Sequence, residues 1–188
     1  MKIEETKLEG CVIIHDTIFR DNRGYFFESF NKKKFEELTG QKIDFVQDNQ
    51  SHSTRGTLRG LHFQKGDAAQ AKLVRVLSGK VLDVAVDVRA NSKTFGQYVA
   101  VELSENSGTQ FFVPRGFAHG FVVLSEQATF FYKCDNYYNK AAEGGIIYND
   151  NDLGIDWGIA DNELVLSEKD LQLPSFVEAT SVLDFAII

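Results

Sequence analysis

Short segments in which apolar and polar residues alternate recur along most of this chain, and they constrain its fold more than any other feature. Within residues 81–88 the even-numbered positions are all aliphatic, while Asp83 and Asp87 stand among the odd-numbered ones. Because the side chains of a β-strand point alternately to its two faces, this pattern predicts a strand with one dry face and one charged face. Many short strands of this kind favour an all-β sandwich or barrel.

Turn and cap residues divide the chain further. Ser78-Gly79 predicts a tight hairpin turn, and the clearest helix covers residues 31–40, with Asn31 as its N-cap and Gly40 as its stop. From about residue 139 the pattern weakens, which indicates an extension wrapped over a core and not a second domain. The segments predicted to be strands are 12–19, 25–30, 44–53, 57–64, 71–77, 81–88, 97–103, 109–113, 120–124 and 128–137.

Length and composition fit one soluble domain over residues 1–188. The net charge of −7 argues against a broad surface for nucleic acid or anionic membrane, since such surfaces are built from clustered Lys and Arg. Cys11 and Cys134 each lie in an apolar or aromatic run, which favours two reduced core thiols over a disulfide. The chain shows no signal-peptide core and no long apolar stretch, so we expect a cytoplasmic protein.

Residues 57–64 place a cation, Arg59, three residues before an imidazole, His62. In a regular strand the two side chains point to opposite faces, but a bulge at Gly60 would turn both toward one cavity, as an anion grip and a base. A single histidine in a strand is more often structural than catalytic. A second segment of the same character, with His119 between glycines, favours the functional interpretation.

Three other strands carry polar side chains of uncertain partners. Lys72 lies on an otherwise apolar face, which is unusual because lysine is seldom buried without a partner. Tyr132 lies on the same face as Phe130, so its phenol is a proton donor if that face lines a cavity and a core residue if it does not. Asp83 and Asp87 fit a polar cavity and a solvent-facing surface equally well.

Several common chemistries are not supported by the sequence. It contains no P-loop, no Gly-x-Gly-x-x-Gly turn before a helix and no Gly-x-Ser-x-Gly nucleophile elbow. Its two cysteines are too far apart for a zinc ribbon.

Four motifs carry a strong resemblance: Arg59-Gly-Leu-His62-Phe-Gln, Lys72-Leu-Val-Arg-Val-Leu-Ser-Gly-Lys, Pro114-Arg-Gly-Phe-Ala-His119-Gly-Phe and Phe131-Tyr132-Lys133. With them the chain resembles the dTDP-4-dehydrorhamnose 3,5-epimerase family from residues 21–24 to residues 167–170. The resemblance implies an all-β, cupin-type jelly-roll barrel with short peripheral helices and a C-terminal extension. It also implies a homodimer that needs no cofactor and makes dTDP-4-dehydro-β-L-rhamnose from dTDP-4-dehydro-6-deoxy-α-D-glucose in dTDP-L-rhamnose biosynthesis.

By this resemblance His62 is the base, Tyr132 the acid and Lys72 the stabiliser of an enolate, while Asp170 orients His62. The chemistry agrees, because a 4-keto group acidifies the protons on C3 and C5, and a neutral imidazole can remove them if the enolate is stabilised. Inversion then needs an acid on the opposite face. A carboxylate behind the histidine fixes its tautomer and stabilises the imidazolium.

The resemblance also implies which residues hold the nucleotide-sugar. Tyr138 would stack on thymine, and Arg23 and Glu28 would reach into the neighbouring subunit's site, since the family's N-terminal strands exchange across the dimer. Stacking and arginine–diphosphate contacts suit such a ligand. The other implied substrate-binding residues are Gln47, Asn49, Arg59, Lys72, His119, Glu143 and Lys169.

Three alternatives stay open at the level of sequence. One is a single-site 3- or 5-epimerase of a related deoxysugar pathway, and another is a sugar-nucleotide-binding module without catalysis. The third is a metal-dependent cupin oxygenase that uses His62 and His119. Against it, Gln64 breaks the His-x-His pair of metal-binding cupins, so we predict no metal.

Overall fold

The computed structural model describes residues 1–181, which form mostly β-strands and two short α-helices, α1 (Lys32–Thr39) and α2 (Phe176–Ser181). Single 3-10 turns lie at Gly66–Ala68, Lys140–Ala142, Asp161–Glu163 and Asp170–Gln172. The strands are β1 (Lys2–Glu5), β2 (Val12–His15), β3 (Phe19–Asp21), β4 (Gly24–Phe26), β5 (Gln47–Thr54), β6 (Leu58–Gln64), β7 (Lys72–Ser78), β8 (Lys80–Asp87), β9 (Tyr98–Ser104), β10 (Thr109–Val113), β11 (Phe117–Val123), β12 (Gln127–Cys134) and β13 (Glu143–Gly145).

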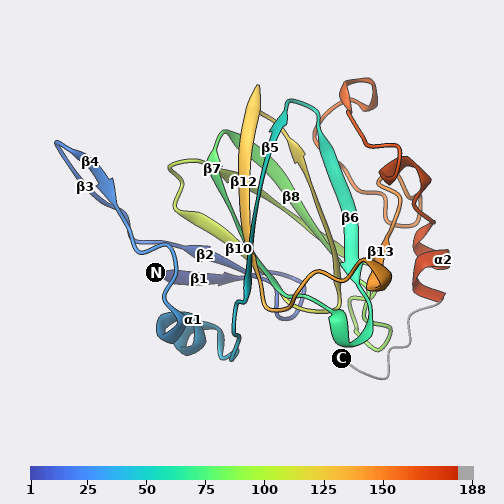
Figure 1. Cartoon of the computed structure of the whole chain (residues 1–188), viewed down its shortest axis with the longest axis horizontal. Helices are drawn as coiled ribbons and strands as arrows, with labels where there is room; N and C mark the ends of the chain where they lie inside the picture. The colour runs from blue at the N-terminus through green and yellow to red at the C-terminus, as the bar shows by residue number, and fades with distance from the viewer. Residues whose placement is uncertain (182–188) are drawn as a thin grey trace.

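Two antiparallel sheets form the body (Figure 1). The first has the strand order β1-β2-β10-β7-β12-β5 and the second the order β13-β6-β11-β8-β9. Aliphatic and aromatic side chains from both sheets, such as Val74, Phe130, Val81 and Ala85, share one buried cluster between them. This confirms the all-β architecture that the alternating pattern predicts.

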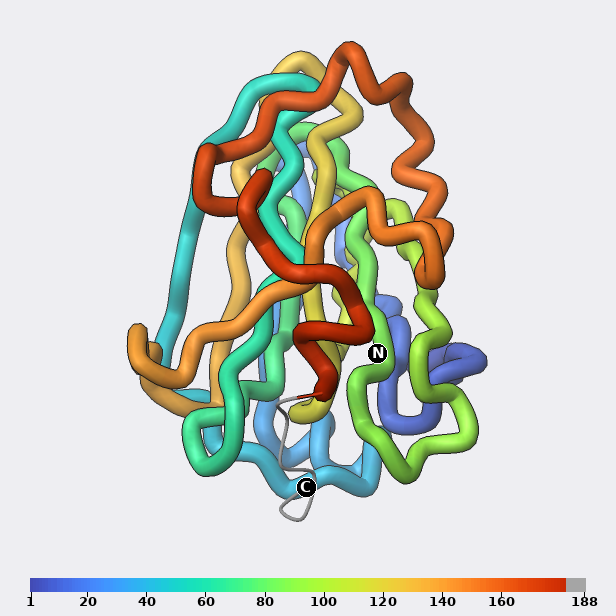
Figure 2. The backbone as a smooth tube through the Cα atoms, turned by 90° about the vertical axis from the view of Figure 1, so that its right-hand side faces the viewer, coloured from blue at the N-terminus to red at the C-terminus, as the bar shows by residue number. Residues whose placement is uncertain are grey.

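The C-terminal segment covers the outer face of the second sheet, as Figure 2 shows for the chain from about residue 145 onward. Val84 and Val86 of β8 pack there with Trp157 and Phe176 in a second buried cluster. The weakly patterned end of the chain is therefore the predicted extension over the core. Because it covers this face, both faces of β8 are buried.

The buried position of β8 decides between the two interpretations of its aspartates. Asp83 and Asp87 are both 0% exposed, so the solvent-facing interpretation is wrong. Asp87 accepts hydrogen bonds from the Arg89 guanidinium and from the hydroxyls of Ser92 and Thr94, which is a structural role. Only Asp83 faces the cavity described below.

Most predicted elements are present, and their differences from the structure lie at the ends. Helix α1 has Asn31 as its N-cap and Gly40 as its left-handed C-cap, and Gly79 makes the predicted turn between β7 and β8. The predicted strands 12–19 and 25–30 are too long, because the chain leaves the sheet after β2 to form the β3–β4 hairpin. Strand β12 ends at Cys134, before the predicted residue 137, and β5 begins at Gln47, after the predicted residue 44.

The β3–β4 hairpin projects from the body like an arm (Figure 1). It exposes Phe19 by 62% and Phe26 by 69%. Elsewhere the two cysteines are buried and free, as predicted. Within residues 1–181, no helix has the length and apolar character needed to cross a membrane.

Candidate active site

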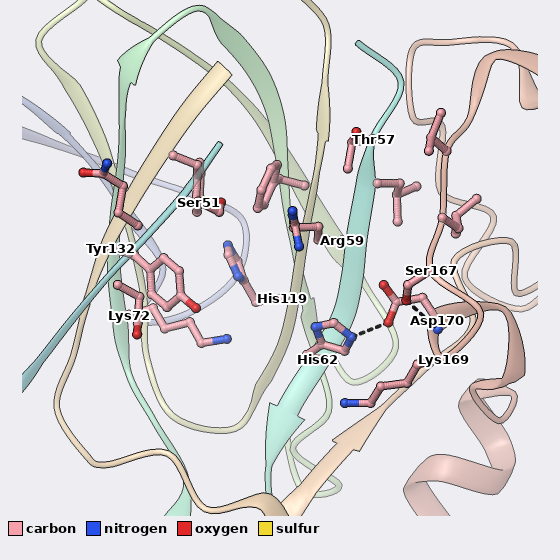
Figure 3. A pocket seen from close by; sticks show the side chains of 17 residues that line it. Ser51, Thr57, Arg59, His62, Lys72, His119, Tyr132, Ser167, Lys169 and Asp170 are labelled. Carbon is pink, nitrogen blue, oxygen red and sulfur yellow. Dashed lines mark hydrogen bonds and ion pairs between the residues drawn. The ribbon is translucent and has the colours of Figure 1, made fainter. Parts of the chain in front are cut away.

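A cavity of about 570 Å³ opens between the two sheets, against residues 165–170 of the C-terminal segment (Figure 3). Strands β5, β6, β7, β11 and β12 all contribute side chains to it. The predicted site residues that line it are Asn49, Arg59, His62, Lys72, His119, Tyr132, Lys169 and Asp170.

A bulge in β6 brings Arg59 and His62 to this one cavity. Opposite β11 the register passes from His119↔His62 to Phe121↔Arg59, so two residues of β6 face Gly120 alone. Gly60 has φ 126°, and a Cβ there would lie 2.6 Å from the Gly120 Cα atom. The predicted bulge is confirmed, and it needs glycine because only a residue without a side chain fits this approach.

His62 and Asp170 form a hydrogen-bonded pair at one wall of the cavity. The His62 Nε2–H group donates to Asp170 Oδ1 at 2.7 Å, and the other ring nitrogen points into the cavity (Figure 3). Burial lowers the pKa of His62, and the hydrogen bond and charge of Asp170 partly offset that shift. The imidazole is therefore neutral near pH 7, with its Nδ1 lone pair available as a base.

Asp170 is held rigidly behind the histidine. Its carboxylate is buried, and its backbone N–H donates to Ser167 Oγ at 3.1 Å, where the chain enters the last 3-10 turn. A carboxylate fixed in this way sets the imidazole tautomer and stabilises the imidazolium that forms on proton transfer. The sequence alone did not indicate Ser167.

Tyr132 and Lys72 point into the cavity from the wall opposite His62 (Figure 3). The Lys72 Nζ atom lies 5.9 Å from the centroid of the Tyr132 ring. Burial raises the pKa of Tyr132 to about 12, so its phenol keeps its proton at neutral pH. Burial also lowers the pKa of Lys72, an effect that negative charge on Cys134, Asp83 and Glu143 opposes.

A second histidine–carboxylate pair forms the floor of the cavity. His119 Nε2 lies 2.9 Å and 3.0 Å from the two carboxylate oxygens of Asp83, and both side chains are buried. Asp83 therefore orients His119, a role that the sequence analysis did not assign to it. The signal was its place on the inward-facing side of β8 with Val81 and Ala85, which lie in the core between the sheets.

The remaining residues predicted to bind the nucleotide lie beside this cavity. Tyr138, Glu143 and Lys169, with His62, line a neighbouring cavity of about 440 Å³. The Tyr138 hydroxyl donates to Glu143 Oε2 at 3.0 Å, and the Lys169 ammonium lies 2.7 Å from the same oxygen. Gln47 lines neither cavity; instead, its side-chain oxygen accepts the backbone N–H of Tyr138 at 2.9 Å.

Arg23 and Glu28 lie away from the cavities of their own chain. Arg23 sits beside the arm's turn and pairs with Asp21 at 2.6 Å, while Glu28 pairs with Lys34 at 2.8 Å. Their predicted contact with a neighbouring subunit's site stays a prediction.

The cavity histidines do not fit a metal centre. Among residues 1–181, no group of three or more His, Cys, Asp and Glu side chains could hold a metal ion. His62 and His119 each bond a carboxylate, and the amide of Gln64 bonds backbone groups of a neighbouring loop. The pattern of a His-x-His pair, a Glu and a third His is therefore missing from this wall.

Solved structures and curated relatives resemble this chain along nearly its whole length. A dTDP-4-dehydrorhamnose 3,5-epimerase from Elizabethkingia anophelis has 59% identity and a TM-score of 0.92, over 96% of this chain and 98% of that one. A dTDP-6-deoxy-D-glucose-3,5-epimerase from Legionella pneumophila, in complex with dTDP-4-keto-L-rhamnose, has 48% identity and a TM-score of 0.90 over 93% and 92%. The dTDP-4-dehydrorhamnose 3,5-epimerase of Salmonella typhimurium is 50% identical over 95% of this chain and 97% of its own.

The fold and the site together define a cupin-like isomerase that acts on carbohydrates, with a base and an acid on facing walls. The sequence also matches the family model described as dTDP-4-dehydrorhamnose 3,5-epimerase over residues 5–178. The chain belongs to the dTDP-4-dehydrorhamnose 3,5-epimerase family.

Proposed function

We propose that this protein epimerises dTDP-4-dehydro-6-deoxy-α-D-glucose at C3 and C5 to dTDP-4-dehydro-β-L-rhamnose, as a step of dTDP-L-rhamnose biosynthesis. Family membership and the Legionella pneumophila complex with dTDP-4-keto-L-rhamnose support the substrate. The observation that carries the proposal is the arrangement of the neutral His62–Asp170 pair opposite the protonated Tyr132 phenol across one cavity.

In the proposed mechanism, His62 Nδ1 removes the proton from a carbon beside the 4-keto group. The electron pair of that C–H bond moves into the enolate, whose oxygen carries the negative charge. The Lys72 ammonium stabilises this charge, and Asp170 stabilises the imidazolium. The Tyr132 phenol then gives its proton to the opposite face of the carbon, and solvent restores the protonation of both residues. The same cycle at the second carbon completes the reaction.

The nucleotide half of the substrate is proposed to occupy the edge of the site. Arg59 carries a guanidinium that suits the diphosphate, while Tyr138 offers an exposed ring for thymine. Asn49 and His119 lie on the cavity wall as further contacts, and Lys169 and Glu143 stand between the two cavities. Gln47 acts through the Tyr138 backbone.

The protein is proposed to be a single-domain homodimer of the cytoplasm that works without a cofactor. The exposed Phe19 and Phe26 of the arm are apolar surface that a second copy would bury, and this supports the exchange of N-terminal strands. Arg23 lies next to these rings on the hairpin, and Glu28 lies at its base, so the arm is the element that would carry both toward the partner's site.

Incubation with the substrate in D₂O tests the function. The proposal predicts deuterium at both C3 and C5 of the product, whereas deuterium at one carbon alone would identify a single-site epimerase. A binding module without catalysis predicts unchanged turnover for His62→Ala. We expect instead a large loss of turnover with retained ligand binding. Stoichiometric iron in the purified protein, together with loss of activity to a chelator, would favour the oxygenase.

A further inference from the structure

The loop that carries Tyr138 depends on two glutamine side chains. It follows β12, which ends at Cys134, and leads into the 3-10 turn at Lys140–Ala142. The Tyr138 side chain is 54% exposed, so hydrophobic packing does little to fix its position. Hydrogen bonds must therefore hold the ring where a nucleobase can use it.

Three backbone groups around Tyr138 are bonded by Gln47 and Gln64. The Tyr138 N–H donates to Gln47 Oε1 at 2.9 Å. The Gln64 amide donates from Nε2 to the Tyr137 carbonyl at 3.1 Å, while its Oε1 accepts the Asn139 N–H at 2.6 Å. The peptide before Tyr138 and the peptide after it are both fixed.

The two glutamines come from different sheets. Gln47 begins β5, the edge strand of the first sheet, and Gln64 ends β6 in the second. Gln64 Nε2 also donates to the Ala68 carbonyl at 2.7 Å, which ties the loop to the turn at Gly66–Ala68. The Tyr138 loop is therefore clamped from both sides across the mouth of the site.

Only an amide side chain can make the Gln64 contacts. It must offer donors to two carbonyl oxygens and an acceptor to an N–H from one planar group. A carboxylate has no donor, an ammonium has no acceptor, and a methionine of similar size has neither. The mechanism proposed above gives Gln64 no other task.

We propose that Gln64 is a positioning residue for nucleotide binding, which acts with Gln47 to hold the Tyr138 ring ready to stack on the base. This inference rests on the proposed role of Tyr138. It implies that the ring is in place before the ligand arrives, so the binding free energy is not reduced by ordering the loop. Removing the clamp would raise KM and weaken nucleotide binding, with little effect on kcat.

The test measures dTDP binding by calorimetry for Gln64→Met, Tyr138→Ala and the double variant. Because base stacking on an aromatic ring is worth about 5- to 100-fold in affinity, Tyr138→Ala should weaken dTDP by a factor in that range. Gln64→Met should weaken it about fivefold or more, through the loss of neutral hydrogen bonds. The double variant should bind no worse than Tyr138→Ala alone, because the clamp acts only through that ring.

Backbone hydrogen exchange separates the clamp from a general loss of stability. The amides of Tyr138 and Asn139 should exchange faster in Gln64→Met, while the amides of β11 keep their protection. Gln127→Met is the matched control, since Gln127 bonds only the exposed His52 at the far end of β12. If Gln64→Met does not fold, Gln64→Glu keeps the acceptor and removes the donors.

The outcomes distinguish the inference from the proposed function. Unchanged dTDP affinity in Gln64→Met, beside weakened affinity in Tyr138→Ala, would overturn the clamp and leave the stacking role intact. Unchanged affinity in Tyr138→Ala would instead overturn the role of Tyr138. A fall in kcat without a change in KM would assign Gln64 to the chemistry and not to positioning.

Discussion

Replacing Asp170 with asparagine isolates the contribution of the carboxylate behind His62. Asparagine has almost the same shape, and its side-chain oxygen can still accept the Nε2–H bond that spans 2.7 Å. What disappears is the negative charge that faces the imidazole. Asp170 is 4% exposed, so water cannot take the place of that charge when the imidazolium forms.

The size of the effect follows from the strength of a hydrogen bond to a charged group. Such bonds are worth about 1.5–3 kcal/mol, which corresponds to a fall in kcat of about 10- to 150-fold. KM should change little, because Asp170 acts on the imidazole and not on the substrate. The charge and hydrogen bond of Asp170 raise the pKa of His62, so their loss lowers it and moves the acidic limb of the kcat/KM profile to lower pH.

Steady-state kinetics from pH 5 to pH 9 measures both effects. Asp152→Asn is the matched control, since Asp152 is an exposed residue of the same C-terminal segment. A kcat within twofold of the parent protein would refute the role of the carboxylate. An acidic limb displaced to higher pH would refute the electrostatic reasoning.

Three further predictions concern the bulge, the oxyanion and the arm. Gly60→Ala should lower the free energy of unfolding by about 2–4 kcal/mol in urea denaturation, because its Cβ meets Gly120 at a positive φ; an unchanged midpoint would contradict this. Lys72→Met should lower kcat about 100- to 1,000-fold while the protein still binds dTDP, and a normal kcat would remove Lys72 from the mechanism. Phe19→Ser with Phe26→Ser should convert a dimer to a monomer in light scattering, whereas an intact dimer would place the interface elsewhere.

Much of the fold follows from local sequence physics. Alternation at period two locates the core strands, and the asparagine and glycine at its ends locate helix α1. Gly60, set between Arg59 and His62, predicts the bulge that lets both side chains reach one cavity. In these places a single residue's chemistry decides the outcome, so tertiary structure is not needed.

Other features depend on contacts that the local sequence does not contain. The polar strand β1 forms because the edge of β2 pairs with it, and the apolar hairpin β3–β4 extends away from the core that its composition favours. The role of Asp83 was undecided until the C-terminal segment was known to cover the other face of β8. Gln64 looked like a broken metal motif, yet its amide bonds a loop more than 70 residues away in sequence.

The central claim is that a base and an acid act on opposite faces of the sugar, and Tyr132→Phe in D₂O tests it most directly. The His62 side chain is 30% exposed, so its proton exchanges with solvent. Without the phenol, His62 should return deuterium to the face from which it removed the proton. NMR should then find recovered substrate that carries deuterium at C3 or C5 with its configuration retained. An inverted product formed at the parent rate, or the absence of any exchange, would contradict the two-faced mechanism.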